Sequence, residues 1–158
     1  MRIPEVGEGK RGLDGLLLYL LRQAATVVAR ELERVLAPLE LSLAVYSALT
    51  MIAAYEDISS AELSRLSMLS PQSANETVQK LVIAGLIRRR SGLSHGRVLR
   101  LQITAAGRER LARGRKLTDR LERCLVARAR ETNEKAVREW LTSVAVALSL
   151  TEVCAVVD

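Results

Sequence analysis

The stretch from Arg88 to Thr104, RRRSGLSHGRVLRLQIT, contains five arginines and no acidic residue. It lies within a longer segment, Thr77 to Arg108, that has seven basic residues and no Asp or Glu, although the whole chain has 24 Lys and Arg and 18 Asp and Glu. The net charge of +6 is therefore concentrated in one place. Guanidinium groups pair with phosphates and carboxylates, so this segment predicts an anionic partner. An isolated run of charge would instead indicate a solvated surface.

Residue types that catalyse reactions or bind metals are scarce. The chain contains one histidine, His95, and two widely separated cysteines, Cys124 and Cys154. Their spacing matches neither a zinc site nor a Ser-His-Asp or Cys-His catalytic arrangement. The sequence also shows no glycine-rich phosphate-binding loop. We therefore expect a protein that is not an enzyme and has no metal or cofactor. We expect both thiols to be buried and inert.

A helix rich in polar residues is predicted just before the arginines. In LSPQSANETVQKLVIAGL, Ser70 is a helix cap, Pro71 occupies the first helical position and Gly85 ends the helix. Ala74 and Val78 belong to its apolar stripe, which Leu81 and Val82 continue. The outward face then carries six side chains that can contact base edges or phosphates: Gln72, Ser73, Asn75, Glu76, Gln79 and Lys80.

The surrounding elements have the order of a winged helix-turn-helix. Ser42 caps a helix that runs to about Tyr55, and DISSAELSRL forms a capping box from Ser59 and Glu62 before a short helix. The polar helix follows after a tight turn. Next, two β-rich runs around the turn at residues 92–96 predict a two-stranded hairpin with a basic tip. Two short helices and a basic hairpin indicate DNA binding.

Long helices are predicted at both ends of the chain. Residues 13–36 are apolar on nearly every side before Pro38 stops the helix, and two more helices cover about 104–129 and 132–150. These faces are hard to bury in one small domain, so a partner subunit is expected to cover them. The longest N-terminal apolar run, residues 16–21, is too short for a signal peptide or a membrane span. We expect a cytoplasmic, nucleoid-associated protein that does not contact membranes.

The segment GLIRRRSGLSHGRVLRLQITAAG resembles, without a gap, the wing of MarR-type transcriptional regulators. The family pattern is Gly-Leu-(Ile/Val), a basic strand, an Asp-x-Arg tip and Leu-Thr-x-x-Gly. The helix order and length also fit, so the resemblance covers about residues 13–150. The matching positions are Gly85, Leu86, Arg89, Arg97, Thr104 and Gly107, with Ile103 in place of the leucine.

The resemblance implies a fold that is mainly α with a small β-hairpin wing (α+β). This is a winged helix-turn-helix lobe, 42–107, with long dimerisation helices, 13–37 and 108–158. Together they form a single unit, 13–158, after a flexible leader, 1–12. The resemblance further implies a homodimeric regulator, usually a repressor, on a pseudo-palindromic operator in double-stranded DNA. A small aromatic or anionic ligand is expected to release it.

The expected contacts divide between the polar helix and the wing. The helix places Gln72, Ser73, Asn75, Glu76 and Gln79 at the major groove, whereas Arg97 enters the minor groove and Lys80, Arg89 and Arg90 contact phosphates. His95 also belongs to the expected DNA-binding residues of the wing. Two residues depart from the family pattern: His95 stands where an acid is usual, and Glu76 repels phosphate although it can accept from a cytosine. The alternative is a winged-helix protein-interaction module, which would not need the wing arginines.

Overall fold

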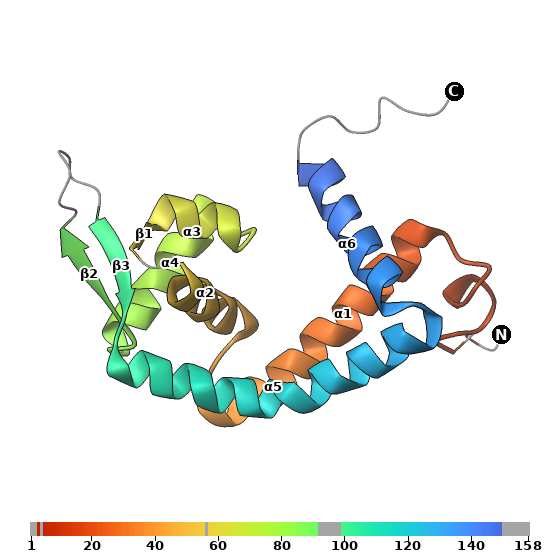
Figure 1. Cartoon of the computed structure of the whole chain (residues 1–158), viewed down its shortest axis with the longest axis horizontal. Coiled ribbons are helices and arrows are strands. Elements are labelled where there is room, and N and C mark those ends of the chain that lie inside the picture. The colour runs from red at the N-terminus through yellow and green to blue at the C-terminus, as the bar shows by residue number, and fades with distance from the viewer. Residues whose placement is uncertain (1–2, 4, 56, 92–98, 150–158) are drawn as a thin grey trace. The chain divides into compact units, whose positions relative to one another are not determined.

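The structure is a computed structural model that describes residues 3, 5–55, 57–91 and 99–149 (Figure 1). His95, Arg97 and Cys154 lie outside these residues. The chain divides into two compact units, Met1–Thr118 and Asp119–Asp158.

The first long helix, α1, spans Leu17–Leu36. It begins four residues later than expected, because Leu13 to Leu16 lie in turns and loop that include Gly15, and glycine disfavours a helix interior. A short 3₁₀ helix, Gly9–Arg11, lies in the segment expected to be a leader. At its other end α1 stops where expected, and a 3₁₀ turn, Ala37–Leu39, contains Pro38.

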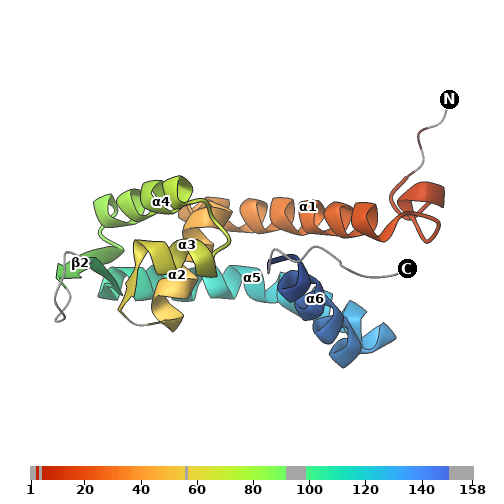
Figure 2. The same cartoon turned by 90° about the horizontal axis from the view of Figure 1, so that it is seen from above.

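Three shorter helices form the centre of the first unit. Helix α2 spans Leu43–Ala54, α3 spans Ser60–Leu66 and α4 spans Pro71–Ile83. Each begins at the serine that the sequence indicated, and each of those serines accepts a hydrogen bond from a backbone N–H three residues later. The three helices lie side by side in both views (Figures 1 and 2).

Gly85 follows α4 with φ of +67°, a conformation that glycine adopts without strain. The backbone N–H groups of Gly85 and Leu86 bond back to Val82 and Leu81. The chain is thereby turned from the end of α4 into the first wing strand.

A three-stranded antiparallel sheet in the order β1-β3-β2 completes the lobe. Strand β2 spans Ile87–Ser91 and β3 spans Leu99–Ile103, which together are the expected hairpin. Strand β1, Ile58–Ser59, was not predicted from the sequence. A strand of two residues has no alternating pattern to detect, and it forms only because β3 lies beside it, with Ser59 opposite Arg100.

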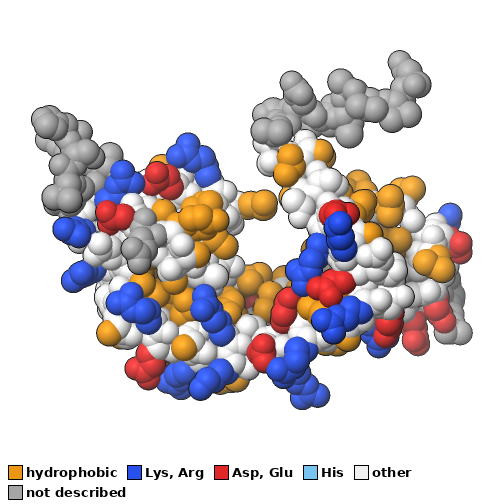
Figure 3. Space-filling view, in the orientation of Figure 1, with side chains coloured by type: hydrophobic (Ala, Val, Ile, Leu, Met, Phe, Trp, Pro, Cys, Tyr) orange, Lys and Arg blue, Asp and Glu red, His pale blue; other side chains and the backbone are white. Residues whose placement is uncertain are grey.

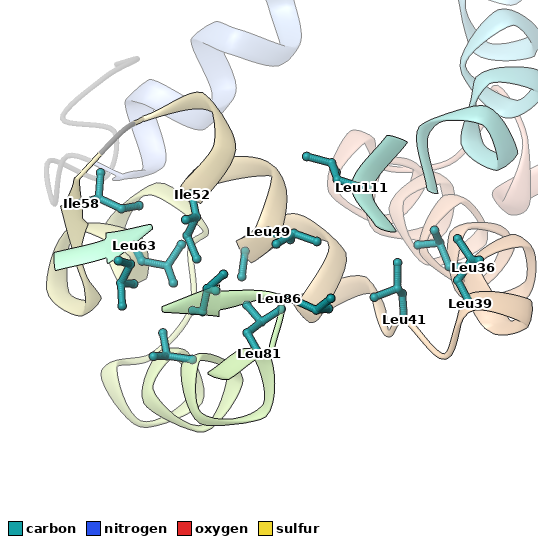
Figure 4. Packing of buried hydrophobic residues seen from close by; sticks show 14 residues of the cluster. Leu36, Leu39, Leu41, Leu49, Ile52, Ile58, Leu63, Leu81, Leu86 and Leu111 are labelled. Carbon is teal, nitrogen blue, oxygen red and sulfur yellow. The ribbon is translucent and has the colours of Figure 1, made fainter. Parts of the chain in front are cut away.

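The core of the lobe is built from aliphatic side chains of the helices and the sheet (Figure 4). Leu49 and Ile52 of α2, Leu63 of α3, Leu81 of α4 and Leu101 of β3 are all almost fully buried. Burial of side chains of this size stabilises the fold by about 1.5–3 kcal/mol each. The core therefore packs α4 and the bases of the wing strands into one lobe.

Helix α5, Ala105–Thr132, begins at the end of β3 and extends from the first unit into the second. Thr104 caps it by accepting from the Gly107 N–H at 3.0 Å, and the same hydroxyl donates to the Gly85 carbonyl at 2.7 Å. The Thr-x-x-Gly pair of the sequence thus joins the wing to α5. In the second unit, α6, Glu134–Ser149, starts at Asn133, whose Oδ1 accepts from the Ala136 N–H.

Candidate nucleic-acid interface

Helix α4 presents the six polar side chains that the sequence singled out. All six are exposed, while Ala74, Thr77, Val78 and Leu81 anchor the opposite face in the core. The exposed set consists of Gln72, Ser73, Asn75, Glu76, Gln79 and Lys80. In the first turn of α4, Pro71 has no N–H and the Ser73 N–H donates to Ser70 Oγ at 3.1 Å, so the turn offers a nearby phosphate little more than the Gln72 N–H.

Some of these side chains already have partners within the helix. Gln72 Nε2 donates to Glu76 Oε1 at 3.1 Å, and the hydroxyls of Ser70 and Ser73 are 2.9 Å apart. Asn75, Gln79 and Lys80 form no side-chain hydrogen bond with a described residue. Glu76 is therefore held by an amide donor, and Asn75 and Gln79 are the side chains with the most capacity for new bonds.

The arginines of β2 are exposed but do not share one face of the strand. Side chains alternate along a strand, so Arg89 projects from one face and Arg88 and Arg90 from the other. The pairing agrees, since Arg89 lies opposite Leu101 and Arg90 opposite Arg100. Arg89 and Arg90 are thus directed from opposite faces of β2.

A hydrogen-bonded row across the sheet was missed by the sequence analysis. It joins Arg88 to Gln102, Gln102 to Asp57, and Arg100 to both Asp57 and Glu62. The capping box drew attention to Glu62, but nothing in the sequence connects it with an arginine 38 positions later. Two arginines of the basic stretch are consequently occupied by the protein itself.

Apolar side chains are exposed at the start of α1 and along α6. Leu17 and Leu18 are 69% and 79% exposed, and no residue of α6 is buried, including Trp140 and Val146. Figure 3 shows hydrophobic side chains at the surface over α6. Surfaces of this kind mark protein–protein contacts.

Cys124 departs from the expectation of a buried thiol. It is exposed on α5, because that stretch of the helix is not covered by another part of the described chain. In those parts of the chain that the structure describes, no three His, Cys, Asp or Glu residues cluster closely enough to bind a metal.

A membrane span requires both sufficient length and high hydropathy. Among the residues that the structure describes, no single helix meets both requirements. One pair, Leu17–Leu39 with Leu43–Ala54, meets them only when its members are joined across a bend of 81°.

Comparison with known proteins identifies the fold. Residues 39–98 match the model of the MarR family. The HTH-type transcriptional repressor Rv2887 of Mycobacterium tuberculosis is 31% identical to the chain over 128 residues, which are 81% of this chain and 92% of that protein. The protein belongs to the MarR family. It is a DNA-binding transcriptional regulator, as the sequence predicted, and regulators of this family act as dimers.

Solved structures of MarR-family regulators agree with this assignment. The transcriptional repressor CouR, bound to a 23-mer DNA duplex, has a TM-score of 0.77 and 27% identity, and the match covers 90% of this chain and 99% of CouR. Rv2887 in complex with salicylic acid has a TM-score of 0.65 and 30% identity, covering 84% of this chain and 98% of that one. The winged helix-turn-helix fold is thereby confirmed, and the family consists of transcriptional regulators rather than enzymes.

Proposed function

We propose that the protein is a repressor that binds a pseudo-palindromic operator as a homodimer. Each subunit then places its α4 helix in the major groove at one half-site. The observation that carries this proposal is α4 itself, whose buried stripe fixes six exposed polar side chains on one face directly before a basic hairpin. A two-fold symmetric dimer matches a DNA site whose half-sites are related by the same symmetry.

The DNA contacts follow from the chemistry of each side chain. Asn75 and Gln79 carry amides that suit bidentate bonds to adenine, and they have no partner among the described residues. Lys80, Arg89 and Arg90 contact phosphates and supply affinity that does not depend on sequence. By the family pattern, Arg97 is proposed to enter the minor groove, and His95, two positions earlier in the sequence, replaces the acid usual in the family.

The remaining polar residues of α4 have a narrower role. Gln72, Ser73 and Glu76 lie in its first two turns, where a recognition helix meets base edges. The bond from Gln72 directs the Glu76 carboxylate along the helix. Glu76 can then accept from a cytosine amino group, and its charge disfavours sites where a phosphate lies close.

The exposed apolar residues of α1 and α6 support the homodimer. They are large, uncharged and too numerous on these helices to be explained as scattered surface residues. A second copy of the chain that covers them would remove this surface from water. The same dimer sets the spacing between the two α4 helices and so determines the distance between the half-sites.

A small aromatic acid is the proposed effector. Rv2887, which is 30% identical in the structure with salicylic acid, supports this class of ligand. A ligand that binds the DNA-free protein more tightly than the DNA-bound protein lowers operator affinity by the ratio of the two affinities. We propose a cytoplasmic, nucleoid-associated location, which follows from the DNA partner, and no catalytic activity.

The experiment that tests the proposal is to sequence the fragments of its own genome that the purified protein retains. A shared inverted repeat among those fragments, bound in a gel shift and released by salicylate, is the expected result. Retention of fragments without a common sequence would refute operator recognition. It would favour the alternative, a winged-helix module whose apolar helices and Glu76 face another protein.

A further inference from the structure

The wing strands are tied to helix α3 by side-chain hydrogen bonds that cross the sheet. Arg88 donates to Gln102 Oε1 from Nε at 3.2 Å and from Nη2 at 3.1 Å, and Gln102 Nε2 donates to Asp57 Oδ1 at 3.1 Å. Arg100 Nη1 donates to the Asp57 carbonyl at 3.1 Å and to Glu62 Oε2 at 3.0 Å. The row therefore runs from β2 through β3 to the first turn of α3.

Glu62 is the residue at which this row meets the helix-turn-helix. Its Oε2 accepts from the backbone N–H of Ser59 at 2.7 Å and from the Ser59 hydroxyl at 2.7 Å, in addition to Arg100. The Ser59 backbone and hydroxyl bonds, followed by the charge of Arg100, hold the pKa of Glu62 below its ordinary value. The carboxylate thus stays charged at neutral pH, and it serves both the cap of α3 and the wing.

Near Arg100, the wing strands have few other contacts with the rest of the lobe. Strand β1 contributes only two residues to the sheet, and they pair with Leu101 and Arg100. Arg100 is the second residue of β3, next to the tip end of the described hairpin, whereas the buried Ile87 and Leu101 hold its base. A side-chain link at Arg100 therefore acts where the backbone pairing with β1 ends.

We propose that Glu62 positions the wing for DNA by holding Arg100, and that Arg100 is a structural arginine rather than a DNA contact. This inference rests on the proposed DNA-binding mode. It divides the arginines of the two wing strands into a structural pair and a DNA-contacting pair. Arg88 and Arg100 are bonded within the protein, whereas Arg89 and Arg90 form no side-chain bond with a described residue and are available for phosphates.

The variant Glu62→Gln separates this role from simple electrostatics. Glutamine at this position can still complete a capping box, so α3 keeps its start, but the ion pair with Arg100 is lost. The substitution removes one acid and raises the net charge from +6 to +7. Charge alone would therefore tighten DNA binding, whereas a displaced wing would weaken it.

The matched control is Glu109→Gln. Glu109 is exposed on α5, carries the same charge and forms no ion pair or hydrogen bond with a described residue. Operator affinity is measured by fluorescence anisotropy on the retained DNA over a range of salt concentrations. We expect Glu62→Gln to weaken binding about fivefold, the upper range for an exposed ion pair, and Glu109→Gln to leave binding unchanged or slightly tighter.

Arg100→Gln and the double variant test the second half of the inference. Arg100→Gln also removes a positive charge and the bond to the Asp57 carbonyl, so it should bind at least as weakly as Glu62→Gln. The double variant should bind no more weakly than Arg100→Gln, because the pair acts as one unit. The slope of log affinity against log salt should stay at its wild-type value in Arg100→Gln, since no phosphate contact is lost. A slope smaller by about 1 would show that Arg100 contacts DNA and would overturn the inference. Losses that add in the double variant would overturn it too.

Hydrogen exchange of the DNA-free protein gives a readout that does not depend on the operator. In Glu62→Gln, amides of β2 and β3 should exchange faster while those of α3 stay protected. Faster exchange confined to α3 would reduce Glu62 to a helix cap and overturn the inference. Retention of genomic fragments that share no common sequence would instead refute the proposed function, and the exchange data would still decide whether Glu62 holds the wing.

Discussion

Replacing Gly107 with alanine should destabilise the protein, although the same change in most helix interiors stabilises. Gly107 lies near the start of α5 and is buried. A Cβ added there would fall well inside van der Waals contact of the Leu86 carbonyl oxygen and 2.8 Å from Cγ1 of Ile103. The obstacle is therefore backbone, which cannot rotate away as a flexible side chain can.

The size of the effect can be worked from these contacts. Alanine gains about 1 kcal/mol over glycine in helix propensity. Overpacking costs about 1–3 kcal/mol, and moving the Leu86 carbonyl would strain its bond from the Thr104 N–H at 3.0 Å, worth about 1 kcal/mol. We expect a net loss of about 2 kcal/mol in the free energy of unfolding.

Urea unfolding followed by circular dichroism, at one fixed protein concentration, measures this loss. The control is Ala106→Gly at the preceding exposed position, which should cost about 1 kcal/mol through propensity alone. If Gly107→Ala is as stable as the wild type, the close packing of α5 on the wing base is not what requires glycine, and the reasoning fails.

Three further results are expected. Asn75→Ala should weaken operator binding by about 1–3 kcal/mol and leave binding to random DNA unchanged; equal losses on both in a gel shift would make Asn75 a backbone contact. Arg90→Gln should reduce the salt slope of DNA binding by about 1 whereas Arg88→Gln, whose guanidinium is held by Gln102, should not; equal slopes would contradict the division of the arginines. The hydrogen bonds from Arg130 and then Arg138 hold the pKa of Glu134 below its ordinary value of 4.5, so its contribution to stability is present above that value and is lost as the pH falls through the lower folded pKa. A melting temperature that falls as steeply with acid in Glu134→Gln as in the wild type would contradict this.

Helix starts were predictable because the interactions that set them are local. A serine cap accepts its hydrogen bond from the backbone N–H only three residues later, so no distant partner is needed. The caps at Ser42, Ser59 and Ser70 were therefore predictable from the sequence. The exposed face of α4 was predictable for the same reason, since helical periodicity decides which side chains can be buried together.

Features that depend on distant partners were not predictable. Strand β1 exists because β3 lies beside it, and the faces of Arg89 and Arg90 follow from a register that the pairing sets. The exposure of Cys124 depends on what covers that part of α5. None of these facts leaves a local pattern in the chain.

The basic stretch shows the same division. The sequence by itself determined that five arginines without an acid follow a polar helix, and this was enough to indicate DNA. Only the tertiary structure decided which of the described arginines are available to DNA. Arg88 meets Gln102 across the sheet and Arg100 meets Glu62 from another helix, because folding brings residues together that are 14 and 38 positions apart.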